Sequence, residues 1–117
     1  MNSIIKEISK LRKQLHQAPE ISGKEKYTSR KIKSYFEALS PDEIVEDLGT
    51  HGLAIVFNGK DKGPSTLFRA ELDALPITEN NDFNYKSNIP GVAHSCGHDG
   101  HMAILCGIGL TISKQRP

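Results

Sequence analysis

Five side chains that can bind a metal or move a proton lie within the eight consecutive residues 94–101, and they are those of His94, Cys96, His98, Asp99 and His101. Thiolate and neutral imidazole are the donors that zinc and its neighbouring transition metals prefer. Gly97 has no Cβ that would hinder Cys96 and His98 from turning toward one point. A closed structural zinc site needs two pairs of donors, and only one such pair is present. The pattern therefore favours half of an open, catalytic metal site.

Other interpretations of the cysteines remain open. Histidines and a cysteine can gather near a turn without binding anything, and a buried free cysteine usually behaves as a small hydrophobic residue. Cys106 lies in an apolar run, residues 104–108, and we predict that it belongs to the core. Cys96 could instead be a redox-active thiol activated by the neighbouring histidines, although no resolving cysteine is close to it in the sequence.

A second group of polar side chains accompanies residues 66–70, which have the composition of a strand. Alternation along a strand would place Arg69, Glu71 and Asp73 on one face. Acidic residues at the carboxyl end of a strand in an open α/β sheet are well placed to meet a ligand. The alternative is an exposed strand face with an Arg–Glu pair of little energetic weight, and the residues alone do not separate the two.

Hydrophobic periodicity predicts three helices that would position these groups. The first spans residues 3–17, with Asn2 and Ser3 as possible caps, and ends before Pro19. The second spans about residues 24–39, behind a capping-box pattern at residues 22–25. The third begins near Asp99 or Gly100. Because it is apolar on all sides, we expect it to be buried against a sheet.

Two strands and one long loop complete the predicted elements. Residues 53–57 and 66–70 read as strands, and the turn-rich residues 58–64 between them predict a hairpin. Residues 76–92 are polar and have no periodicity, which is typical of a long functional or disordered loop. This loop leads directly to the Cys96 cluster. We see no repeats or linkers, so residues 1–117 form one domain or part of one.

Three motifs, at residues 15–20, 69–79 and 94–101, together resemble the amidohydrolase subfamily of the aminoacylase-type metallopeptidases. This subfamily includes N-acyl-amino-acid amidohydrolases, hippurate hydrolases and plant auxin-conjugate hydrolases. The motifs follow the order and spacing of the family and cover nearly the whole chain. Two departures are Glu71, where the family usually has Asp, and the sequence Ala93-His94-Ser95-Cys96, where it has Met-His-Ala-Cys.

The resemblance implies an α/β fold, namely the amino-terminal portion of an aminoacylase-type zinc-peptidase catalytic domain, with helices packed on a mixed sheet. Residues 1–117 would be the first part of this single catalytic domain. The paired glutamates that hold the general base, two further histidine ligands and the lid or dimerisation domain would all lie outside it. A homodimer of the full-length protein would form through that missing domain.

The same resemblance implies roles for the cluster. Cys96 and His98 would bind a two-metal centre, with Zn or Mn as the divalent ions, and Asp73 would be the carboxylate that orients a metal ligand. His94, His101 and Asp99 would bind substrate or orient ligands, and no residue matches the general base. The complete enzyme would hydrolyse the amide bond of N-acyl amino acids or similar conjugates. The isolated chain would be inactive, and the alternative is a truncated, non-catalytic metal-binding or interaction module.

Composition narrows the range of partners. The formal net charge is +1 and the hydrophobic content is 37%, with no Trp. A basic helix face over residues 24–33 has no aromatic stacking platform, so we predict no nucleic-acid partner. No apolar run reaches the roughly 18 residues of a membrane span, and the amino terminus lacks a signal-peptide core. We therefore expect no membrane association and a cytoplasmic location.

Overall fold

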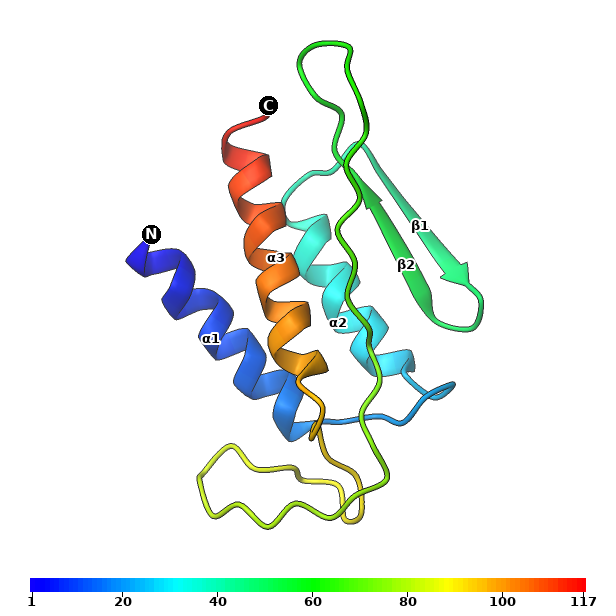
Figure 1. Cartoon of the computed structure of the whole chain (residues 1–117), viewed down its shortest axis with the longest axis vertical. Coiled ribbons are helices and arrows are strands. Elements are labelled where there is room, and N and C mark those ends of the chain that lie inside the picture. The colour runs from blue at the N-terminus through cyan, green and yellow to red at the C-terminus, as the bar shows by residue number, and fades with distance from the viewer.

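The computed structural model describes all residues, 1–117, and contains three helices and one two-stranded sheet. In chain order these are α1 (Asn2–Gln17), α2 (Lys26–Glu37), β1 (Glu43–Leu48), β2 (Gly52–Val56) and α3 (His98–Lys114). Helix α3 lies between α1 and α2, and the β1–β2 hairpin lies on the far side of α2 (Figure 1). No helix combines the length and the apolar composition that a membrane crossing requires.

Helix α1 confirms the periodicity prediction and packs directly against α3. Leu11 and Leu15 on its inner face are buried in the core. Gly107 of α3 allows close approach, since a Cβ placed there would lie 3.2 Å from the Cδ1 atom of Ile8. The predicted caps are wrong, because the helix begins directly after Met1 without a side-chain hydrogen bond.

Helix α2 is also present, but the capping box predicted at residues 22–25 is wrong. The carboxylate of Glu20 accepts hydrogen bonds from the Thr28 amide and hydroxyl, both at 2.6 Å, and from the Tyr27 amide at 3.3 Å. Glu20 therefore satisfies amides of the first turn from outside the helix. Glu25 occupies the N-cap position without a capping bond.

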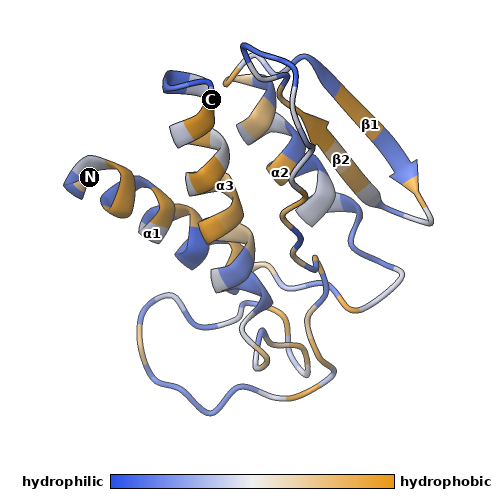
Figure 2. Cartoon of the chain, turned by 45° about the horizontal axis from the view of Figure 1, so that its top comes forward, coloured by the Kyte–Doolittle hydropathy of each residue, from blue (hydrophilic) through white to orange (hydrophobic).

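Helix α3 is the most apolar of the three helices (Figure 2). Its expected packing against the sheet is wrong, since α3 packs on α1 and α2, and α2 separates it from the hairpin. A Cβ at Gly109 would lie 2.3 Å from the Phe36 ring of α2, so a side chain there would force the two helices apart. Burial is incomplete, because Ile104 is 57% exposed.

The sheet differs from the predicted hairpin in its partner strand. Strand β2 confirms the strand expected at residues 53–57, but it pairs antiparallel with β1, which the sequence did not indicate. Residues 66–70 form no strand and run as an extended, exposed segment. A strand requires a hydrogen-bonding partner, and no second strand lies beside this segment in the chain.

The long loop at residues 76–92 is confirmed, as it contains neither helix nor strand. Its base is closed by an antiparallel bridge between Leu75 and Ala93, with amide–carbonyl hydrogen bonds of 3.0 Å in both directions. A parallel bridge joins Ala74 to Ile21. The Leu75–Ala93 bridge brings the segment after Asp73 next to the segment that carries the histidine–cysteine cluster.

Candidate metal centre

His98 and Asp73 are in direct contact across a sequence separation of 25 residues. The Nδ1 atom of His98 lies 2.8 Å from the Asp73 carbonyl oxygen and 3.1 Å from its carboxylate. An Nδ1–H held in this way leaves Nε2 as the free acceptor of the ring, which is the arrangement that metal-binding histidines commonly use. The hydrogen bond is accepted by the main-chain carbonyl of Asp73, so the orienting role of its carboxylate stays a prediction.

Cys96 lies in the turn that leads into α3. Its side chain is exposed and makes no disulfide. Gly97 is the N-cap of α3 and has φ = 100°, in the left-handed region that strongly favours glycine. The backbone therefore turns sharply between the thiol of Cys96 and the first helical residue, His98.

His94 is 6% exposed, and its Nε2 atom is buried without a hydrogen-bond partner. Burial lowers the pKa of His94, and the positive charges of nearby histidines act in the same direction, against the opposing effect of Asp99. A neutral imidazole with an unpartnered nitrogen is a potential ligand or hydrogen-bonding group for a species that this chain alone does not supply.

His101 lies one turn into α3, and its ring centroid is 6.1 Å from that of His98. Its side chain is exposed and lines a shallow depression of about 190 Å³ together with Phe68, Arg69 and Ile104. Of the predicted cluster, His101 is therefore the histidine most accessible to a small molecule.

The Asp99 side chain is buried, with 1% exposure; it forms an ion pair with Arg12 at 2.8 Å and accepts a hydrogen bond from His16 at 2.7 Å. A carboxylate enclosed in this way cannot contact a substrate, so only the orienting role predicted for it remains. The second ring nitrogen of His16 contacts Glu79 at 2.7 Å. The sequence did not indicate this contact, although both residues lie in the motifs that carry the family resemblance.

The remaining predicted groups lie outside this cluster. Glu71 forms an ion pair of 2.9 Å with Arg69, and both side chains are exposed, at 41% and 78%. This matches the alternative of a solvent-exposed pair. Cys106 is fully buried, and burial raises the pKa of its thiol to about 12, as expected for a core cysteine. Since Cys106 is inaccessible, it offers Cys96 no resolving thiol.

The donor set fits part of a metal site. Cys96 is exposed, and His98 has a free Nε2 with its other nitrogen anchored. No three side chains of His, Cys, Asp or Glu surround a common point as a metal site would require. The chain thus offers two suitable donors, fewer than the three protein ligands that a catalytic zinc usually has.

Comparison with known proteins places these features in a family. Residues 67–116 match the model of peptidase family M20/M25/M40. The chain is 37% identical to an N-acyl-L-amino acid amidohydrolase of Geobacillus stearothermophilus, over 90% of this chain and 28% of the relative. It is 36% identical to thermostable carboxypeptidase 1 of Saccharolobus solfataricus, over 93% of this chain and 28% of the relative.

A solved structure agrees with the sequence matches. The YxeP protein of Bacillus subtilis, described as a dinuclear metal binding peptidase of the M20 family, superposes on 98% of the chain and 32% of its own length, with a TM-score of 0.92 and 31% identity. The chain spans less than a third of the length of these relatives. Residues 67–116 thus resemble the M20/M25/M40 peptidase family in sequence, and the chain has the fold of an amino-terminal portion of an M20 peptidase.

Proposed function

We propose that this chain supplies Cys96 and His98 as ligands to a two-metal centre that hydrolyses amide bonds in N-acyl amino acids or similar conjugates. The contact between His98 and Asp73 is the observation that carries the proposal, because it leaves Nε2 of His98 available beside an exposed thiol. The name of the amidohydrolase relative supports the substrate class. We propose Zn or Mn as the metal.

Cys96 and His98 would hold the metal, which when bound would supply polarisation of the amide carbonyl and a water molecule of lowered pKa. Asp73 holds the ring of His98 so that Nε2 keeps one direction. We assign His94 and His101 to substrate binding or ligand orientation; His101 is exposed, whereas His94 is buried. Asp99 fixes the first turn of α3 through its contacts with α1.

We assign no general base to the chain, since none of its residues matches the paired-glutamate motif that the resemblance implies. Residues 1–117 would form the first part of one catalytic domain, and the base, the remaining ligands and a lid or dimerisation domain would come from the part of the relatives that the chain does not cover. We therefore expect the isolated chain to be inactive. Its two-donor site is also what the alternative, a non-catalytic metal-binding module, would contain.

A hybrid enzyme tests the proposal. Residues 1–117 replace the matched segment of the G. stearothermophilus amidohydrolase, and release of free amino acid from N-acetyl amino acids is measured with Zn or Mn. The hybrid should be active, a chelator should remove the activity, and Cys96→Ala and His98→Ala should abolish it, whereas the control Cys106→Ala should retain it. The isolated chain should stay at background. Full activity of the hybrid with both ligand substitutions would refute the assignment.

A further inference from the structure

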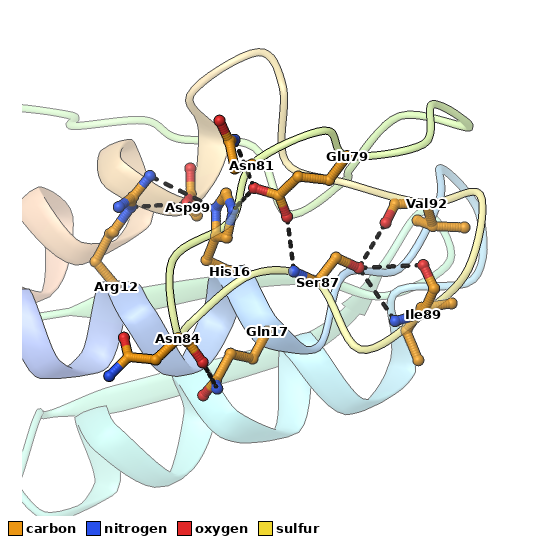
Figure 3. A network of polar contacts seen from close by, with 10 residues as sticks. All are labelled: Arg12, His16, Gln17, Glu79, Asn81, Asn84, Ser87, Ile89, Val92 and Asp99. Carbon is orange, nitrogen blue, oxygen red and sulfur yellow. Dashed lines mark hydrogen bonds and ion pairs between the residues drawn. The ribbon is translucent and has the colours of Figure 1, made fainter.

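The imidazole of His16 bridges two carboxylates from segments that are far apart in the sequence (Figure 3). Its Nδ1 atom lies 2.7 Å from Asp99 Oδ2, and its Nε2 atom lies 2.7 Å from Glu79 Oε2. All three side chains are nearly inaccessible, with relative exposures of 4% for His16, 1% for Asp99 and 6% for Glu79. The contacts are therefore buried and short.

The charges in this cluster balance. Burial opposes ionisation of Glu79, but hydrogen bonds from Asn81, the Ser87 amide and His16 outweigh it and lower the pKa of Glu79 to about 2. Asp99 is held by the same ring at 2.7 Å and forms an ion pair of 2.8 Å with Arg12. Ionised carboxylates only accept hydrogen bonds. Both ring nitrogens of His16 therefore donate, and His16 with Arg12 offsets the two negative charges.

The two carboxylates belong to the two segments that form the candidate metal centre. Asp99 directly follows His98 in α3, and Glu79 lies six residues beyond Asp73, on the segment that begins at the Leu75–Ala93 bridge. One side of the His98–Asp73 contact is thus tied to His16 through Asp99, and the other through Glu79. No other side chain makes hydrogen bonds to both segments.

We propose that His16 is a positioning residue for the metal centre: its doubly donating imidazole fixes the segment of Asp73 against the start of α3 and so sets the direction of His98 Nε2. This inference rests on the proposed function of His98 as a metal ligand. The closest alternative is that His16 only stabilises the fold. A glutamine carries both of its donor hydrogens on one nitrogen, and its other terminal atom is an acceptor. It could therefore not donate from two opposite sides to the two carboxylates, as the imidazole does.

The experiment compares His16→Gln with Ile32→Val in the full 117-residue chain. Ile32 is a buried core residue of α2 outside this network, and Ile→Val removes one methylene group at a cost of about 0.5–1.5 kcal/mol. It is therefore the control for a loss of stability alone. Cobalt(II) is titrated into each protein, and the thiolate-to-cobalt absorption and the ligand-field bands are recorded together with the thermal midpoint.

We expect His16→Gln to weaken cobalt binding roughly 10- to 100-fold, the usual effect of losing a group that orients a metal ligand, and to shift the ligand-field bands. Ile32→Val should leave the cobalt affinity within about twofold of the wild type and the ligand-field bands unshifted. If His16→Gln does not fold, Glu79→Gln is the milder second variant and should give a smaller change in the same direction. Equal cobalt affinity and identical bands in the wild type and the network variants would overturn the proposal.

A metal-free readout separates this proposal from the proposed function. Nitrogen-15 NMR of the His98 ring at fixed pH reports which nitrogen carries the proton. In the wild type and in Ile32→Val we expect the Nδ1–H form, and in His16→Gln a mixture of the two tautomers. If the wild type shows no cobalt absorption that depends on Cys96, the proposed metal function is wrong. The NMR comparison of the wild type with His16→Gln still tests whether His16 orients His98. An unchanged His98 spectrum in His16→Gln would contradict it.

Discussion

The Nδ1 atom of His98 lies close to two oxygens of one residue: it is hydrogen-bonded to the carbonyl oxygen of Asp73 at 2.8 Å and lies 3.1 Å from the carboxylate of Asp73. The carbonyl contact survives any substitution of the side chain. The ring of His98 is therefore oriented by the backbone of Asp73, which lies close to the Leu75–Ala93 bridge. The charge of the Asp73 carboxylate acts in addition, and a substitution of the side chain can remove it while the backbone contact remains.

Asp73→Asn should consequently lower metal affinity by about 10-fold, at the low end of the range for such contacts, because the charge is lost while the carbonyl contact remains. Glu71→Asp should be nearly silent, since Glu71 pairs with Arg69 in solvent. Isothermal titration of both variants with zinc measures the difference. A large effect at Glu71 with none at Asp73 would mean that the wrong acidic residue supports the site.

The stability of the chain should depend on pH through Glu79. Its pKa is lowered from 4.5 to about 2 in the folded protein, so ionised Glu79 stabilises the fold fully above pH 4.5. This contribution is lost as the pH falls toward 2. Urea unfolding between pH 7 and pH 2.5 should show that the free energy of unfolding falls more steeply with decreasing pH in the wild type than in Glu79→Gln. Parallel curves for the two proteins would contradict the assignment.

Substitution by alanine should lower the stability of the fold at one glycine of α3 and raise it at another. Gly109→Ala places a methyl group 2.3 Å from the Phe36 ring, and such overpacking costs about 1–3 kcal/mol. Gly100→Ala meets nothing within 4 Å, and replacing a helical glycine by alanine stabilises by about 0.5–1 kcal/mol. Thermal unfolding tests both. A stabilising Gly109→Ala would show that α2 and α3 are packed less closely than described.

Glu20 and Glu25 make a matched pair for the start of α2. Glu20→Ala removes the acceptor for the Thr28 amide and hydroxyl and should destabilise the chain by about 1–2 kcal/mol, as the loss of a helix cap does. Glu25→Ala removes a buried carboxylate oxygen that has no partner, so its effect should be close to zero. Denaturant unfolding distinguishes them. The opposite order would restore the capping box expected from the sequence.

The sequence predicted local elements better than the contacts between them. The helices followed from periodicity, because the stripe from Ile4 to Leu15 and the apolar content of α3 are local patterns. Strand β1 was missed because three of its six residues are acidic, which hides the strand pattern. Residues 66–70 have the composition of a strand, but pairing depends on a partner that the local sequence cannot reveal.

The candidate site divides in the same way. Cys96 and His98 were found because a Cys-x-His pair is a short-range signal. The bridge from His16 to Asp99 and Glu79 joins residues separated by 83 and 63 positions, and no spacing rule indicates it. The only available signal was that all three residues occur in the motifs shared with the family.

Metal content tests the central claim, that Cys96 and His98 bind a divalent metal, most directly. The chain and its variants are dialysed against zinc or manganese at equal free concentration and analysed for bound metal, with His51→Ala as a histidine control outside the cluster. The wild type and His51→Ala should bind metal, more weakly than a complete site, and Cys96→Ala and His98→Ala should bind none. Equal metal content in all four proteins would contradict the account.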